Sequence, residues 1–183
     1  GDFKYKDVNK DGVVDLKDQV PYGYSSVPDY TFATAFSLQY KSWDLSLLFQ
    51  GVTHVSNFYA DRGTHSKFFF VERHLESWTK ERAENGYRIS YPRLTGESSP
   101  NEILNSFFLE DASYIRLKNV ELGYTLPQHV SRRIGPNSIR VYLNGFNLLT
   151  WDRLSTKNFD PEIPDSFTYP NTRLFNFGIN LTF

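Results

Sequence analysis

The stretch from residue 174 to 183 alternates apolar and polar side chains at almost every position. It reads LFNFGINLTF, and its apolar residues on one parity are Phe175, Phe177, Ile179, Leu181 and Phe183. Successive side chains of a β-strand point to opposite faces, so this stretch predicts a strand with one apolar and one polar face. Its length matches the roughly ten residues that a tilted strand needs to cross a bilayer. A strand of a soluble sandwich alternates in the same way, so this stretch alone leaves both architectures open.

A second alternating pattern predicts a β-hairpin near the start of the chain. Residues 30–40 and 43–49 each alternate, and only Lys41 and Ser42 separate them. Two such runs joined by two residues are typical of a hairpin. Aromatic residues flank the turn, as in the interfacial girdles of membrane barrels. The rows expected to face lipid are Phe32, Phe36 and Leu38 in the first strand and Leu45, Leu47 and Phe49 in the second.

Residues 112–124 predict a further strand whose alternation slips near its middle. The apolar residues before the slip and after it fall on opposite parities: Ile115 and Leu117, then Val120, Leu122 and Tyr124. A β-bulge near Lys118 and Asn119 would return all of them to one face. Residues 138–148 alternate again and predict another strand, with Ile139, Val141 and Leu143 on its apolar side.

The connections between these strands alternate between short and long, which is typical of outer-membrane barrels. Three segments are then expected outside the cell: residues 1–29, 54–111 and 149–173. The end of the last strand is expected on the periplasmic side. Open sheet edges in hydrocarbon leave backbone groups unpaired, so about five strands cannot close a barrel. The predicted fold class is all-β: an antiparallel transmembrane β-barrel segment, completed by strands outside this sequence.

Long loops on a rigid scaffold often carry function. Within one of them, residues 68–82 read FFFVERHLESWTKER, and the spacing of His74, Leu75 and Trp78 predicts a short helix. Aromatic and arginine side chains dominate protein interfaces and stack on sugars. The candidate contacts with substrate or a partner protein are therefore Tyr59, Arg62, Trp78 and Trp151.

Composition excludes several classes of protein. The chain has 20 basic and 21 acidic residues, so its charge gives no indication of a nucleic-acid partner. It has no cysteine, and hence no disulfide framework or thiolate metal site. No run of eighteen or more apolar residues predicts a transmembrane helix. No secretory signal peptide is visible, so under the barrel interpretation this sequence is a C-terminal piece.

Residues 7–18, DVNKDGVVDLKD, match the spacing of a calcium-binding loop. Calcium prefers six to eight oxygen ligands, and Gly12 stands where such loops turn sharply. The predicted ligands of a structural Ca²⁺ are Asp7, Asn9, Asp11, the Val13 carbonyl, Asp15 and Asp18. Two features differ from an EF-hand: the last ligand is Asp rather than Glu, and the flanks are not clearly helical.

Several stretches resemble, in order and almost from end to end, the C-terminal part of SusC/RagA-type TonB-dependent outer-membrane transporters. They are residues 1–51, LEDASYIRLKNVELGYTLP at 109–127, IRVYLNGFNLLTW at 139–151, DPE at 160–162 and YPNTR at 169–173. The resemblance implies a plugged barrel of about twenty-two strands, with its plug domain outside this chain. It also implies a SusD-like surface lipoprotein as partner, energy from the TonB complex, and import of oligosaccharides or peptides.

Two other classes of function compete with transport. A soluble calcium-dependent carbohydrate-binding β module would also explain the acidic loop and an aromatic content of 17%. It predicts polar outer faces, whereas apolar rows repeat on several strands. An enzyme would need a catalytic motif, and none of the familiar nucleophile, zinc or phosphate-loop motifs is present. We therefore expect no catalytic residues.

Overall fold

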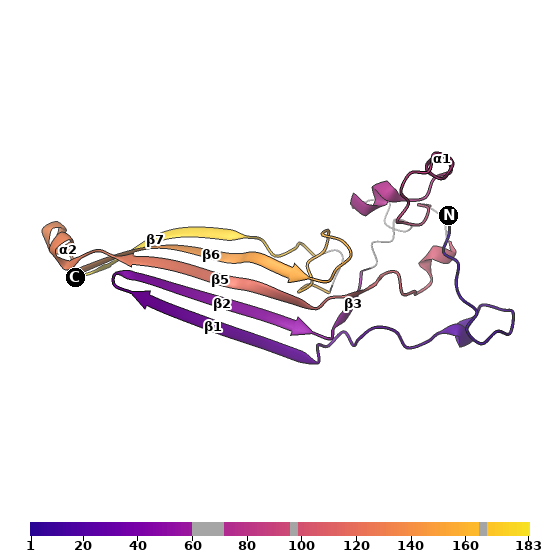
Figure 1. The fold of residues 1–183 in the computed structure, drawn as a ribbon, viewed down its shortest axis with the longest axis horizontal. Coiled ribbons are helices and arrows are strands. Elements are labelled where there is room, and N and C mark those ends of the chain that lie inside the picture. The colour runs from indigo at the N-terminus through magenta and orange to yellow at the C-terminus, as the bar shows by residue number, and fades with distance from the viewer. Residues whose placement is uncertain (60–71, 96–98, 165–167) are drawn as a thin grey trace.

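The computed structural model describes residues 1–59, 72–95, 99–164 and 168–183. Its main feature is an antiparallel sheet of five long strands in the order β1-β2-β5-β6-β7 (Figure 1). The strands are β1 (Tyr30–Tyr40), β2 (Trp43–Thr53), β5 (Tyr114–Thr125), β6 (Ser138–Asp152) and β7 (Leu174–Thr182). This arrangement confirms the prediction of an antiparallel all-β sheet.

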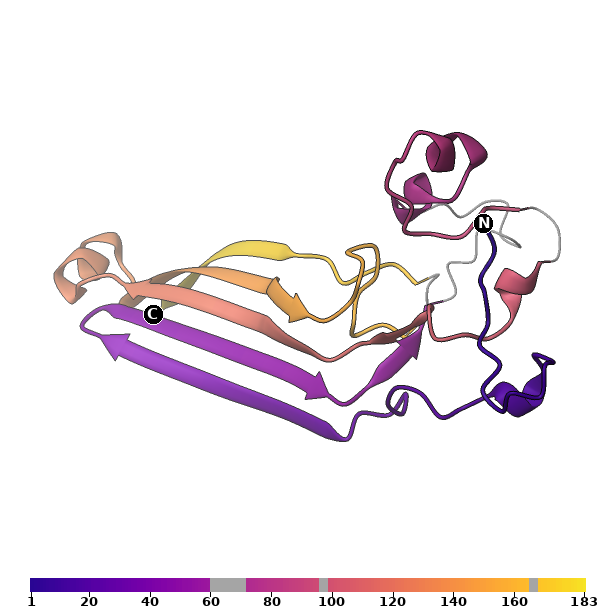
Figure 2. The same ribbon diagram turned by 45° about the vertical axis from the view of Figure 1, so that its right-hand side comes forward.

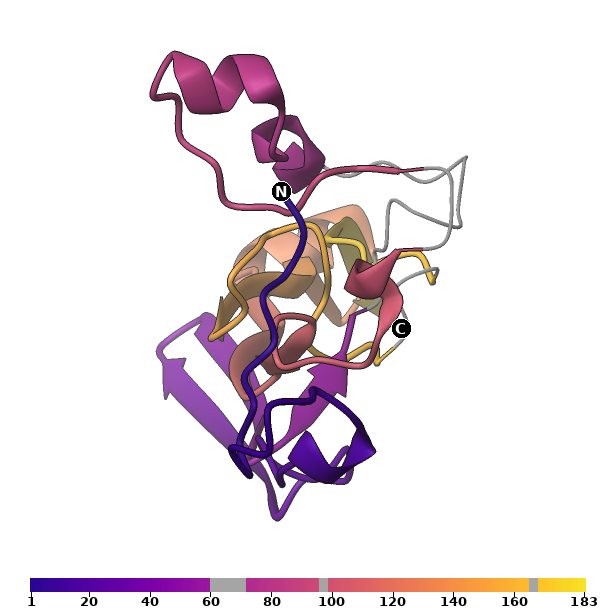
Figure 3. The same cartoon turned by 90° about the vertical axis from the view of Figure 1, so that its right-hand side faces the viewer.

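Short elements gather at the two ends of this sheet (Figures 1 and 2). The connection between β5 and β6 forms α2 (Gln128–Ile134) at one end, where the β1–β2 turn also lies. The other end, here called the loop end, carries the remaining elements: η1 (Leu16–Asp18), β3 (Ser56–Phe58), η2 (Glu72–Glu76), α1 (Lys80–Glu84), η3 (Pro100–Glu102) and β4 (Leu109–Asp111). Figure 3 looks from the loop end and shows these segments in front of the sheet. None of the helices among the described residues is long and apolar enough to cross a membrane.

The strand register gathers the apolar side chains on one face of the sheet. Phe36 pairs with Leu47, and Leu47 pairs in turn with Val120. Across the remaining strands Leu122 pairs with Leu143, which pairs with Phe177. Many of these side chains are exposed, including Phe36 at 51% and Phe177 at 67%. Apolar residues that alternate along single strands therefore merge into one continuous exposed surface, here called the apolar face.

A β-bulge in β5 keeps this face continuous, as the slipped alternation predicted. Leu117 pairs with Phe49 and Asn119 with Leu48, so Lys118 is the extra residue opposite β2. The register between β5 and β6 shifts at the same place. One inserted residue reverses the parity of the strand, so the apolar residues before and after Lys118 share a face.

The opposite face of the sheet, here called the polar face, carries an ion triad across three strands. The Arg140 guanidinium donates to Asp44 Oδ1 at 3.0 Å and to Glu121 Oε1 at 2.7 Å. Asn144 Nδ2 donates to the other oxygen of Glu121 at 3.2 Å. Gly123 lies directly beneath the triad, because a Cβ atom there would overlap both Arg140 and Asp44. A glycine therefore gives the charged groups room to meet across β5.

Two elements differ from those predicted. β6 continues to Asp152, so residues 149–152 belong to the sheet and the long loop begins after them. The helix predicted over 68–82 is two short helices, η2 and α1, and residues 68–71 lie outside the described part. The break falls at Ser77, which bridges to Tyr91, and at Thr79, whose hydroxyl accepts from Arg82 N at 3.2 Å and caps α1. Tertiary pairing and a cap thus override the helical spacing.

Candidate functional site

The most heavily bonded group on the polar face is Arg116, near the loop end of β5. Its Nη2 donates to Asp160 Oδ1 and its Nη1 to Glu162 Oε2, both at 2.6 Å. Its Nε donates to Thr150 Oγ1 on β6 at 2.9 Å. Only 3% of the Arg116 side chain is exposed. The planar guanidinium therefore uses all three nitrogens to hold two loop carboxylates against the sheet.

Further bonds complete this ion cluster, here called the Arg116 latch. Lys118 Nζ donates to both oxygens of Glu162, at 2.8 and 3.0 Å. Asn171 donates through its side chain to Glu162 Oε2 at 2.9 Å and through its backbone to Asp160 Oδ2 at 3.1 Å. Two cations thus balance two carboxylates. The latch fixes both halves of the loop after β6 to the sheet.

A second buried carboxylate, Glu110 of β4, ties the loop segments to one another. Ser155 donates to Glu110 from its backbone at 2.6 Å and from its hydroxyl at 2.7 Å. Arg73 Nη1 donates to the same carboxylate at 3.2 Å. The Arg73 guanidinium also lies 5.4 Å from the ring centre of Tyr91 and 5.6 Å from that of Phe107. The loop end therefore has a packed interior with a satisfied charge, which favours defined loop positions.

The four predicted contact residues take different positions. The Tyr59 side chain is fully buried and stacks on Phe159, with ring centres 4.7 Å apart. It has no exposed surface here for a partner, and burial raises the pKa of its hydroxyl. Trp78 is half-buried, and its ring packs so closely on Gly1 that a Cβ there would overlap it. Trp151 is 53% exposed on the apolar face of β6, opposite Ile115. Arg62 lies outside the described residues.

The predicted calcium ligands accept hydrogen bonds from their own loop. Asp7 accepts from Lys10 N at 2.6 Å and from Gly12 N at 2.9 Å. Asp18 accepts from Val8 N at 2.7 Å and from Asp15 N at 2.8 Å, and these bonds hold the pKa of Asp18 below its ordinary value. Within the described residues no group of three or more His, Cys, Asp or Glu side chains is placed to hold a metal. The carboxylate and amide oxygens of this loop suit Ca²⁺ chemically.

Calcium binding at this loop thus stays a prediction, which titration of the full-length protein tests. We expect millimolar Ca²⁺, in the range of weak extracellular sites, to bind the wild-type loop. The double variant Asp7→Ala/Asp11→Ala should lose this binding. Isothermal titration calorimetry measures it, and Asp29→Ala, an acidic change outside the loop, serves as the control. Equal calcium uptake by the wild type and the double variant would rule out this site.

Known proteins resemble the chain over its full length. It is 34% identical to TonB-dependent receptor P26 of Formosa agariphila over 100% of the chain and 20% of that receptor. It is 27% identical to TonB-dependent receptor P3 of the same organism, over 98% of the chain and 19% of the receptor. No family model matches the chain. The chain therefore spans about a fifth of the length of these relatives.

Solved structures give the same result for the fold. A structure of the RagAB peptide transporter matches with a TM-score of 0.64 and 28% identity, over 87% of the chain and 18% of the solved chain. The RagAB peptide importer in its "closed-closed" state matches with a TM-score of 0.64 and 26% identity, over 94% of the chain and 20% of the solved chain. The chain is thus a segment homologous to TonB-dependent receptors of the SusC/RagA-like kind.

This homology confirms the family resemblance and implies an outer-membrane location. The relatives are receptors and transporters, in agreement with the prediction that the chain is not an enzyme. Sequence reasoning had not singled out the Arg116 latch as a site. Its signal was the DPE segment at 160–162, which stood out only through the resemblance. A second signal was Arg116 itself, a charged residue within the alternating pattern of residues 112–124.

Proposed function

We propose that this chain is the C-terminal segment of the membrane barrel of a TonB-dependent nutrient importer. The observation that carries the proposal is the apolar face, which runs without interruption across five paired strands. The polar face has the ion triad and the Arg116 latch. The strands of a membrane barrel contact lipid on one face and a polar lumen on the other, so they need one apolar and one polar face. Upstream strands would pair with β1 and β7 and close the barrel.

The loop end then faces the cell exterior, and β7 ends at the periplasmic side. This orientation agrees with short turns at one end of the sheet and long segments at the other. A SusD-like lipoprotein would cover the loop end, and the TonB complex would act through the plug outside this chain. The solved relatives are a peptide transporter and importer, which supports peptides ahead of oligosaccharides as the substrate class.

Uptake by cells that express the full-length receptor tests this proposal. We expect fluorescent oligopeptides or oligosaccharides to accumulate in the periplasm only when TonB is present. Deletion of a SusD-like lipoprotein partner should reduce uptake while the receptor remains in the outer membrane. Accumulation that is unchanged without TonB would contradict active import.

A soluble calcium-dependent carbohydrate-binding module is the alternative, and detergent dependence separates the two. Such a module would bury the apolar face or make it polar, since exposed apolar patches larger than a few hundred Å² are rare on soluble monomers. Full-length protein that stays monodisperse without detergent would favour the soluble module.

A further inference from the structure

At the loop end of β5 and β6, the two faces of the sheet differ sharply in exposure. Tyr114 and Arg116 lie on the polar face and are only 5% and 2% exposed. Ile115, which lies between them on the apolar face, is 44% exposed, and its partner Trp151 on β6 is 53% exposed. Because successive side chains of a strand point to opposite faces, another part of the chain must cover the polar face here and leave the apolar face open.

The covering layer is the first part of the loop after β6, residues 153–164, here called the inner loop. Lys157 Nζ donates to both oxygens of Asp152, at 3.0 and 3.1 Å, and Asp152 lies on the polar face at the end of β6. Further along the inner loop, Asp160 and Glu162 join the Arg116 latch. In Figures 1 and 2 the loop after β6 stays beside the end of β6, whereas η2 and α1 lie farther from the sheet. The inner loop therefore lies against the polar face.

Buried packing holds the inner loop in one position. Leu154 is 8% exposed and belongs to a buried cluster with Val55, Tyr59 and Ala112. The Tyr59 hydroxyl donates to the Asp160 carbonyl at 3.3 Å. Moving the inner loop aside would expose this cluster and separate the buried ions of the latch, and both changes cost free energy. We therefore expect the inner loop to stay on the sheet during import.

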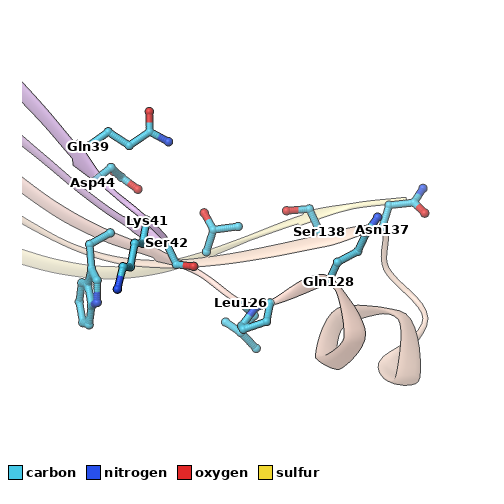
Figure 4. A pocket seen from close by; sticks show the side chains of 11 residues that line it. Gln39, Lys41, Ser42, Asp44, Leu126, Gln128, Asn137 and Ser138 are labelled. Carbon is cyan, nitrogen blue, oxygen red and sulfur yellow. The ribbon is translucent and has the colours of Figure 1, made fainter.

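The opposite end of the polar face borders open space. A cavity of about 440 Å³ lies there beside the β1–β2 turn (Figure 4). Gln39 and Asp44 line it as a residue pair of β1 and β2, and Thr125 lines it from β5. In the proposed barrel this end of the polar face opens toward the periplasm. The covering by the inner loop is thus a feature of the outer end of the lumen.

We propose that the inner loop forms a fixed constriction at the outer mouth of the lumen and limits the bulk of the peptide that enters. A layer of chain packed on the inner wall narrows the passage, and the latch prevents that layer from moving aside. Extended linear peptides would pass, and peptides with bulky branches would be excluded. This inference rests on the proposed function, because it takes the polar face as the wall of the lumen.

Bulk added to the inner loop tests this proposal. The Lys157 side chain is 79% exposed, so a group attached there would narrow the passage further. The segment has no cysteine, and Lys157→Cys in the full-length receptor offers a site for labelling on cells. Uptake of a fluorescent linear oligopeptide should survive a small methylthio label and be largely lost with a maleimide that carries a polyethylene glycol chain. Unchanged uptake with the large label would overturn the proposal. Wild-type cells treated with the same reagents give the background.

Lys17→Cys is the matched control at the loop end. The Lys17 side chain is 74% exposed and, like Lys157, it lies near an aspartate, Asp15 at 4.0 Å. The helix η1 that carries it lies away from the sheet (Figure 1). The large label at Lys17→Cys should therefore leave uptake unchanged. Equal loss of uptake at both positions would show that bulk anywhere at the loop end blocks import, which contradicts a local constriction.

Release of the inner loop gives an independent readout. Arg116→Met should raise the uptake of a peptide with a bulky branched side group relative to that of the linear peptide. This ratio does not depend on the amount of receptor in the membrane. An unchanged ratio in a receptor whose inner loop has become open to proteolysis would contradict the proposal. Should Arg116→Met fail to reach the outer membrane, the labels at Lys157→Cys decide the question alone.

The outcomes also separate this inference from the proposed function. A receptor that imports the linear peptide regardless of bulk at Lys157→Cys contradicts the constriction and leaves import in place. A wild-type receptor that imports no peptide contradicts peptides as the substrate class and, with them, this inference.

Discussion

Replacement of Arg116 by methionine is expected to release the loop after β6 from the sheet and to lower the free energy of unfolding by about 3–5 kcal/mol. Methionine fills a similar volume but removes the charge and all three donors. The Asp160 side chain is only 7% exposed, so in the latched position its own negative charge would be buried and uncompensated. Lys118 would still neutralise Glu162. The cost therefore comes mainly from Asp160 and Thr150, which lose their partner.

Two further variants separate the causes of this effect. Arg116→Lys keeps the charge but cannot form the fork of bonds to both carboxylates, so we expect an intermediate loss. Arg153→Met removes a cation that is 68% exposed and bonded to Asp111 alone, and it should cost about 1 kcal/mol or less. Urea unfolding of the full-length receptor in lipid vesicles measures the stability. Proteolysis within residues 153–164 reports release of the loop. A loop that stays protected in Arg116→Met would show that the latch does not hold it.

The strands were predictable from the sequence because the alternation of apolar and polar side chains is a local pattern. Alternation along β7 and the β1–β2 hairpin specifies which side chains share a face, and the structure pairs them accordingly. The bulge at Lys118 was also predictable, since only one inserted residue reconciles the two parities of β5. The end of β6 was less predictable: the pattern predicted a strand over 138–148, and the strand continues to Asp152.

The candidate site was not predictable from local pattern, because it depends on contacts far apart in the chain. Arg116 meets Asp160 and Glu162 at separations of 44 and 46 residues. A strand pattern gives the face of Arg116 but not its partner. Tyr59 shows the same limit. An aromatic residue in a predicted loop suggests a contact with substrate or a partner, but the Tyr59 side chain is buried and stacks on Phe159. Residue type alone does not distinguish the interior of a loop cluster from its surface.

Leu47→Arg is expected to lower the free energy of unfolding from a bilayer by about 2–4 kcal/mol if the apolar face contacts lipid. Leu47 lies near the middle of β2, between Phe36 and Val120 in the register. An arginine there would have to place its charge in hydrocarbon or bend toward a distant headgroup. Among arginine substitutions on the apolar face, the largest effect is therefore expected at this mid-strand position.

Ser46→Arg is the matched control, one residue away on the polar face. Ser46 is exposed and pairs with Glu121, so an arginine there meets water and a carboxylate. We expect its effect to be within about 1 kcal/mol of the wild type. Urea-dependent folding of the full-length receptor into vesicles measures both variants, and surface labelling in cells reports insertion. Equal stability of Leu47→Arg and Ser46→Arg would mean that the two faces of the sheet have the same surroundings. That result would contradict lipid contact by the apolar face.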